Sequence, residues 1–233
     1  MKLSPDVYDR LPPDSILRRL GGAELEAFLD YSIARTLGRG EVLLEQGDSG
    51  DSLTIVLSGT LKACLRAADG REIVIDYLGA GSVIGEMAVF DEKPRAASVV
   101  AVDEASVVVL QRRFVLAFLE KTPRAALTII SVLCEKLRRT NARIEDSAET
   151  VTAARLARAV LRLVAEHGVP GAGDGGLRFR VSQEELGSYV GLARENVNRH
   201  LRRWADGGLV RLSRGELTVL DVEALEALAS GLE

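Results

Sequence analysis

The stretch Ser182–Trp204 constrains the fold most, because it predicts two short helices joined by a tight turn. Ser182 can cap the first helix, and Glu185 stands where it would complete a capping box. Gly191 falls where the chain must reverse, and glycine accepts the left-handed conformation that such a turn often needs. The second helix carries one apolar face, made of Ala193, Val197, Leu201 and Trp204. A helix-turn-helix is therefore expected.

The other face of the second helix carries side chains suited to reading bases. These residues are Arg194, Glu195, Asn198, Arg199 and Arg202. Arginine pairs with guanine, glutamate accepts a hydrogen bond from cytosine, and asparagine suits adenine. The alternative is an ordinary amphipathic helix with a solvated charged face. The remainder of the chain favours DNA binding.

The bulk composition is that of a soluble globular protein of one large or two modest domains, with 233 residues, 47% of them hydrophobic and 27% charged. The net charge of -4 means that a nucleic-acid site must be a local basic surface. No apolar run is long enough to span a membrane, and the N-terminus lacks a signal peptide, so we expect a cytoplasmic protein. Two cysteines and two histidines predict no metal site.

Short apolar runs separated by glycine and aspartate fill the region from Ile33 to Leu110. Asp69-Gly70 lies between two such runs and is a hairpin signal. Many short strands with regular turns predict a β-sandwich or barrel. Before this region, residues 14–31 predict short helices.

One segment of the β region, Gly85–Phe90 followed by Pro94–Ala97, combines a glycine with two charged residues. Arg95 could take a phosphate in a bidentate manner, and Glu86 could accept from a ribose hydroxyl. A solvated turn with a surface ion pair is the alternative.

A long helix is predicted from Pro123 to Ser147. Its apolar positions advance by alternate steps of three and four, the pattern of a coiled-coil seam. The seam consists of Leu127, Ile130, Cys134, Leu137, Asn141 and Ile144. We expect the chain to dimerise through this helix, with Asn141 fixing the register.

The expected class is α+β, and the chain divides into four parts. These are residues 1–122 (N-terminal helices and β-roll), 123–147 (dimerisation helix), 148–151 (hinge) and 152–233 (winged helix-turn-helix). The wing is a hairpin of residues 209–212 and 216–220, in which Arg211 and Arg214 can touch phosphates. A helix over 222–232 closes the chain.

This order of elements and motifs resembles the cyclic AMP receptor protein and fumarate–nitrate regulator family of bacterial transcription regulators. The resemblance covers nearly the whole chain. It rests on the segments Gly47–Gly59, Gly85–Met87, Pro94–Ala97, Thr140-Asn141 and Gly191–Arg199.

The resemblance implies a cyclic-nucleotide site. Glu86 would hold the ribose 2′-hydroxyl and Arg95 the cyclic phosphate, while Gly85, Met87 and the backbone near Ala97 would line the pocket. Thr140 would face the base, with Asn141 reaching across from the partner helix. Ala96 replaces a serine or threonine common in nucleotide-binding members, which removes one hydroxyl donor. Cyclic AMP is the first expectation and cyclic GMP the second; another ligand or a vestigial pocket is the alternative.

The resemblance also implies an allosteric homodimer that binds double-stranded DNA and RNA polymerase, not an enzyme. Arg194, Glu195 and Arg199 match base-reading positions and suggest a palindrome with TGTGA-like half-sites. Asn198 stands where the family archetype has glycine. The residues nearer the phosphates would be Ser182, Ala193, Asn196 and Arg202.

Overall fold

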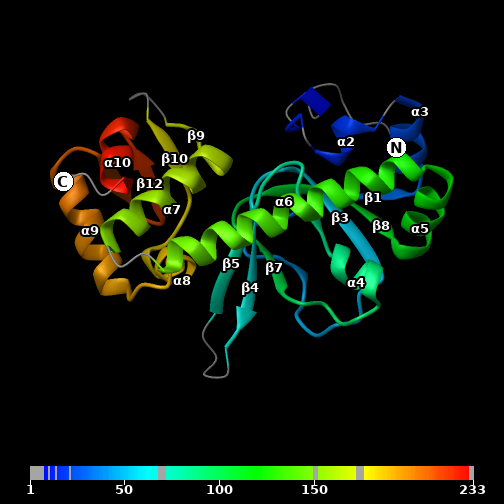
Figure 1. The fold of residues 1–233 in the computed structure, drawn as a ribbon, viewed down its shortest axis with the longest axis horizontal. Coiled ribbons are helices and arrows are strands. Elements are labelled where there is room, and N and C mark those ends of the chain that lie inside the picture. Colours follow the sequence, from blue (N-terminus) through cyan, green and yellow to red (C-terminus); the bar gives the residue numbers. More distant parts are fainter. Residues whose placement is uncertain are drawn as a thin grey trace. The chain divides into compact units, whose positions relative to one another are not determined.

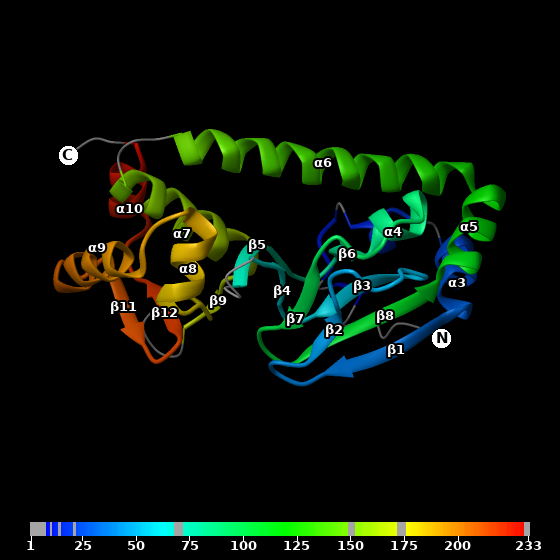
Figure 2. The ribbon, with the colours of Figure 1, turned by 90° about the horizontal axis from the view of Figure 1, so that it is seen from below.

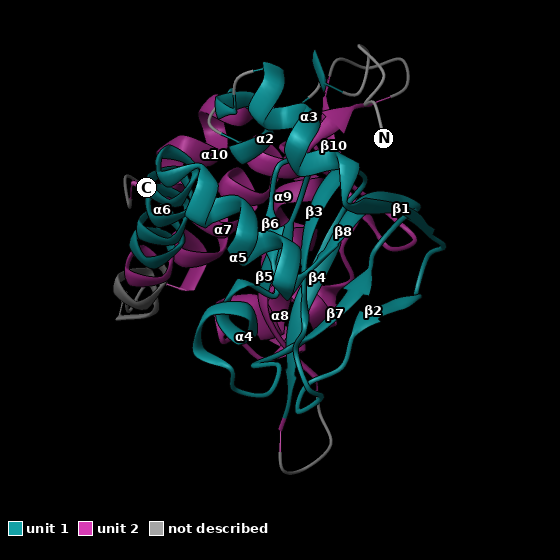
Figure 3. Cartoon of the chain, turned by 90° about the vertical axis from the view of Figure 1, so that its right-hand side faces the viewer, with its two compact units in different colours: residues 1–66, 76–139 teal, residues 67–75, 140–233 magenta. Residues whose placement is uncertain are grey.

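The computed structural model describes residues 8–9, 11–13, 15–20, 22–67, 72–148, 152–171 and 176–230, with residues 143–148 described as backbone only. The chain forms two compact units, shown in different colours in Figure 3. Unit 1 comprises residues 1–66 and 76–139, and unit 2 comprises residues 67–75 and 140–233. The turn at Asp69-Gly70 and residues 149–151 of the expected hinge lie outside the described residues.

Unit 1 is built on two four-stranded sheets. One sheet has the order β1 (Ser32–Leu37), β8 (Ala105–Gln111), β3 (Ser52–Ser58) and β6 (Val83–Ile84). The other has the order β2 (Val42–Leu44), β7 (Ser98–Ala101), β4 (Leu61–Arg66) and β5 (Glu72–Leu78), whose first residues belong to unit 2. The β1–β8, β3–β8 and β4–β7 pairs are antiparallel and join strands that are distant in sequence, whereas β4 and β5 are neighbours both in the sheet and in the chain. This is the predicted β-roll.

Helices cover the first sheet and close its core. α3 (Gly22–Asp30) and α5 (Arg112–Lys121) lie at one end of β1 and β8 (Figure 2), and α2 (Ile16–Arg19) adds Ile16 and Leu17 to the same core. Phe28 of α3 meets Phe118 of α5 edge to face, with ring centroids 5.2 Å apart. Neither α5 nor the short helix α4 (Glu86–Asp91) is among the predicted elements, and the six residues of α4 are too few to show helical periodicity.

The long helix α6 (Pro123–Ala148) agrees closely with the predicted segment and is the green helix of Figure 1. Ala125 and Ile129 bury one face of it in the core of unit 1. A different face remains outside: Leu127, Ile130 and Leu137 are 65%, 53% and 61% exposed. Cys134 and Asn141 are exposed on α6 as well. The side chain of Ile144 lies outside the described residues.

Unit 2 packs helices against a small sheet. The helices are α7 (Thr152–His167), α8 (Gln183–Val190), α9 (Arg194–Asp206) and α10 (Val222–Ala229). The sheet has the order β11 (Val210–Ser213), β12 (Glu216–Val219), β10 (Leu177–Phe179) and β9 (Val169–Pro170). The wing hairpin is confirmed as β11–β12. The short strand β9 is not among the predicted elements; it forms because Val169 and Pro170 pair with Arg178 and Leu177 of β10.

The helix-turn-helix is confirmed, including its local chemistry. The Ser182 hydroxyl accepts from the Glu185 N–H at 3.1 Å, and the Glu185 carboxylate accepts from the Ser182 N–H at 2.9 Å. Gly191 ends α8 at φ 67°, the left-handed conformation expected of a glycine there. The expectation that Ala193 belongs to the apolar face of the second helix is wrong. α9 begins at Arg194, and Ala193 is its exposed N-cap residue.

Candidate functional site

The first candidate site surrounds the turn from β6 into α4 in unit 1. Gly85 adopts φ 79°, and a Cβ there would lie 2.3 Å from Nη1 of Arg95 and 2.9 Å from the carbonyl oxygen of Ser52. Only glycine permits this backbone to approach the guanidinium so closely. Glu86 follows as the first residue of α4 and is 3% exposed.

The carboxylate of Glu86 has a cation beside it from a different element. Nζ of Lys136, in α6, lies 2.8 Å from Oε1 of Glu86. A buried carboxylate needs such compensation, since desolvating an isolated charge is costly. Lys136 is absent from the expected site residues. A charged residue off the seam is ordinary in such a helix, so its sequence position gives no signal.

Arg95 lies beside Gly85 and is 5% exposed. Its Nη1 donates to the Gly85 carbonyl oxygen at 3.0 Å, and its Nη2 donates to the carbonyl oxygen and hydroxyl of Ser52 at 2.9 and 3.0 Å. Burial lowers the pKa of the guanidinium, while the nearby carboxylates of Asp51, Glu86 and Asp48 oppose that shift. Glu86 and Arg95 are therefore brought together and buried, unlike a solvated turn with a surface ion pair.

The remaining residues expected in this site are more open. Met87 is 54% exposed. Ala96 is also exposed, and Ala97 is partly buried just before β7. Thr140 and Asn141 are exposed on the part of α6 that belongs to unit 2.

The second candidate site is the outer face of α9 in unit 2. Val197, Leu201 and Trp204 bury the inner face, at 0%, 2% and 4% exposure. Four residues of the outer face are exposed, namely Arg194, Glu195, Arg199 and Arg202. Asn196 and Asn198 are partly buried, while the wing arginines Arg211 and Arg214 are exposed. The chain thus gathers arginines locally despite its net charge of -4.

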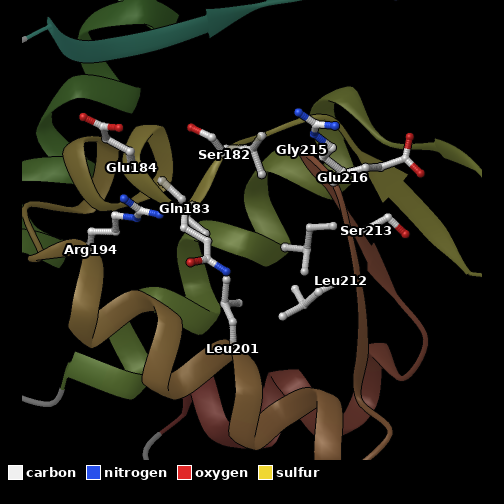
Figure 4. Close-up of a pocket in the computed structure, with 13 residues that line it drawn as sticks. Ser182, Gln183, Glu184, Arg194, Leu201, Leu212, Ser213, Gly215 and Glu216 are labelled. Atoms are coloured by element: carbon white, nitrogen blue, oxygen red, sulfur yellow. The ribbon is translucent and has the colours of Figure 1, made fainter.

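A groove of about 350 Å³ runs between the start of α8, α9 and the wing (Figure 4). Ser182, Arg194 and Arg214 contribute polar groups to it, and Leu201 and Leu212 contribute apolar ones. The Val181 N–H donates to the Gly215 carbonyl oxygen at 3.1 Å, which ties the wing turn to the start of α8. Gln183 also lines the groove and is absent from the expected residues; as a helix-start residue it carries no distinctive sequence signal.

In the part of the chain that the structure describes, no group of three or more His, Cys, Asp or Glu side chains could hold a metal ion. None of the described helices combines the length and apolar character needed to cross a membrane.

Known families match both units. The cyclic nucleotide-binding domain matches residues 34–122, and the Crp-like helix-turn-helix domain matches residues 154–228. A CRP-like cAMP-activated global transcriptional regulator of Mycobacterium tuberculosis is 32% identical over 187 residues, covering 80% of this chain and 84% of that protein. The cyclic AMP receptor protein of Thermus thermophilus is 32% identical over 213 residues, covering 91% and 95%.

The fold is similar to that of a solved structure. That structure is a transcriptional regulator of the CRP/FNR family from Thermus thermophilus, with a TM-score of 0.73 and 23% identity. The match covers 85% of this chain and 98% of that one.

Proposed function

We propose that this chain, which belongs to the cyclic AMP receptor protein and fumarate–nitrate regulator family of DNA-binding transcription regulators, is a homodimer controlled by cyclic AMP. Cyclic GMP is the second choice of effector. The dimer binds a palindrome with TGTGA-like half-sites and acts on transcription with RNA polymerase.

The observation that carries the proposal is that two oppositely charged side chains, Glu86 and Arg95, are both buried next to Gly85. Glu86 can accept from a ribose hydroxyl, and Arg95 can donate to the two free oxygens of a cyclic phosphate. Because the backbone at Gly85 approaches the Arg95 guanidinium closely, its peptide groups lie near the place where the phosphate would bind. Two relatives at 32% identity are named for cyclic AMP, which supports that nucleotide as the first choice.

The exposed apolar face of α6 supports a dimer. Leu127, Ile130, Cys134 and Leu137 follow a/d spacing, and α6 packs on its own core through other residues. A second copy of α6 in parallel orientation would cover this face. Asn141 would then meet its counterpart near the two-fold axis. Thr140 lies one helical turn beyond Lys136 and so faces the same side of the helix.

The outer face of α9 supports direct readout of DNA. Arg194 and Arg199 suit guanine, and Glu195 suits cytosine, which matches a TGTGA-like sequence. In this surface the Ser182 hydroxyl accepts from the Glu185 N–H, which leaves its own hydrogen for a phosphate. A two-fold dimer would place its α9 helices in successive major grooves, so the half-sites repeat about one helical turn apart.

The proposed control is a population shift. Cyclic nucleotide bound at Glu86 and Arg95 would favour one pairing of the two α6 helices around Asn141, and the segment 148–151 would transmit that choice. The ligand can shift the equilibrium only by its difference in affinity for the two states.

Calorimetric titration with cyclic AMP and with cyclic GMP tests the ligand. We expect micromolar binding of one nucleotide to wild type and its loss in Glu86→Gln and Arg95→Lys, two variants that keep side-chain volume. Arg35→Ala removes an arginine that is exposed on β1 and should bind like wild type. Thermal unfolding of each variant identifies any that fail to fold. Unaltered binding in both site variants would contradict the proposed pocket.

A regulator that binds DNA without nucleotide is the second candidate, and two observations favour it. Ala96 offers no hydroxyl to a phosphate. Arg95 and Glu86 already have partners in Ser52 and Lys136, which a nucleotide would have to displace or share. This candidate predicts no heat with either nucleotide and unchanged DNA affinity when they are added.

A further inference from the structure

One polar contact links the middle of α9 to the first residue of α7. Nε2 of His200 lies 3.2 Å from the hydroxyl oxygen of Thr152. The two residues are 48 positions apart in sequence, and both belong to unit 2. This distance is within hydrogen-bonding range.

The surroundings of His200 suit a neutral ring that shares a hydrogen bond with a hydroxyl. The ring is partly buried, with the Trp204 ring centroid 6.3 Å away. Burial lowers the pKa of His200, and the positive charges of Arg199 and Arg203 lower it further. The α7 side contributes the neutral hydroxyl of Thr152. A neutral imidazole nitrogen and a hydroxyl can pair as donor and acceptor in either sense.

The contact adds a directional interaction to α9, whose buried residues are apolar. Val197, Leu201 and Trp204 anchor α9, but apolar contacts depend weakly on orientation. A hydrogen bond depends steeply on angle and distance, so it restricts rotation of α9 about its axis. His200 directly follows Arg199, so this restriction also fixes where the Arg199 side chain leaves the helix.

We infer that Thr152 and His200 are positioning residues for DNA recognition, which set the rotation of α9 relative to the start of α7. Neither side chain needs to touch a base for this role. The inference rests on the proposed function, in which the outer face of α9 reads DNA. It extends that function by making the residue that begins α7 part of sequence specificity.

The test is fluorescence anisotropy on two duplexes, an operator selected from a random pool with the wild-type protein and a scrambled duplex. The variants are Thr152→Val, Thr152→Ser, His200→Phe and the double variant Thr152→Val/His200→Phe. Thr152→Val removes the hydroxyl at nearly constant shape, and we expect operator affinity to fall about five-fold, the effect of one hydrogen bond. Thr152→Ser restores the hydroxyl and should bind within about two-fold of wild type.

The double variant identifies the contact itself. If the two residues act only through each other, the double variant binds the operator about as well as either single variant. Affinity for the scrambled duplex and the salt dependence of binding should not change, since no phosphate contact is lost. Losses that simply multiply in the double variant, or wild-type operator affinity in Thr152→Val, would overturn the inference.

Controls separate this inference from folding and from ligand control. Thermal unfolding and circular dichroism check each variant, and Thr36→Val on exposed β1 reports the effect of the same change elsewhere. If Thr152→Val does not fold, Thr152→Ser and His200→Gln take its place, since His200→Gln keeps a polar atom near Nε2. The inference is supported if both variants retain operator affinity while His200→Phe loses it. Binding is measured with and without cyclic AMP, so a failure of nucleotide control appears in wild type and leaves the variant comparison intact.

Discussion

At the scale of single residues, the contact between Glu86 and Lys136 is asymmetric. The Glu86 side chain is 4% exposed, whereas the Lys136 side chain is 38% exposed. The carboxylate therefore depends on the lysine more than the lysine depends on it. Removing the lysine leaves a buried carboxylate with less compensation, and partial exposure of the site limits the penalty.

We predict that Lys136→Met destabilises unit 1 by about 1–2 kcal/mol, as expected for a lost hydrogen bond to a partly screened charge. Urea unfolding monitored at low salt measures this change. Adding Glu86→Gln to Lys136→Met should recover part of the loss, because the buried charge is then gone. Lys93→Met is the matched control, since Lys93 is 77% exposed beside Asp91 and should change stability little. Equal stability of Lys136→Met and wild type would contradict the proposed dependence.

His200 gives a prediction about pH. Its pKa in the folded chain is below the ordinary value of about 6.5 that the unfolded chain retains. Between the two values the unfolded chain binds more protons, so stability of unit 2 is fully present above about pH 6.5 and falls as the pH drops below it. His200→Gln should flatten this dependence between about pH 7 and pH 5. The measurement is the difference in melting temperature between wild type and variant across that range; a constant difference would contradict it.

At the scale of elements, the seam of α6 makes the proposed dimer testable. Ile130 is 53% exposed in the middle of the apolar face. We predict that Ile130→Glu converts the dimer to monomer, because two carboxylates would be buried opposite each other. Light scattering after size-exclusion chromatography reads the mass, and operator binding should weaken together with it. Thr128→Glu adds the same single negative charge on α6 outside the seam and should remain dimeric.

Cross-linking through cysteine tests independently whether the α6 seams of two chains pair. Cys134 is exposed at a seam position, whereas Cys64 is buried in β4. A short bismaleimide should cross-link two chains through Cys134, and Cys134→Ser should abolish the cross-link while Cys64→Ser retains it. A wild-type mass of two chains without any cross-link would point to a dimer that uses a different surface.

The elements that the sequence predicts correctly are those with a local signal. The Ser182 capping box, Gly191 and the a/d spacing of α6 each lie within a few turns of chain, so the pattern and the structure coincide. The helix α4 and the strand β9 are too short to show a period, and their geometry comes from tertiary packing. Ala193 fits the spacing of an apolar face, but the tight turn places it before the helix. Lys136 belongs to the pocket only through folding, 50 residues from Glu86.

At the scale of the whole molecule, charge is distributed unevenly. The chain carries a net charge of -4, yet α9 and the wing present five exposed arginines used by the proposed DNA surface, namely Arg194, Arg199, Arg202, Arg211 and Arg214. DNA attraction must therefore come from this surface and not from the mean charge. Salt dependence of binding counts the phosphates that it neutralises.

The two groups of arginines should respond differently to substitution. We predict that Arg214→Ala weakens binding to operator and scrambled duplexes alike and lowers the slope of log affinity against log salt by about 1 per subunit, hence about 2 for a dimer. Arg194→Ala should instead cost about 1–3 kcal/mol per half-site on the operator and relax the preference for guanine. Anisotropy titrations at several salt concentrations measure both quantities. A slope that falls by about 1 would indicate that only one wing of the dimer meets DNA, and equal losses of specificity in both variants would contradict the division between α9 and the wing.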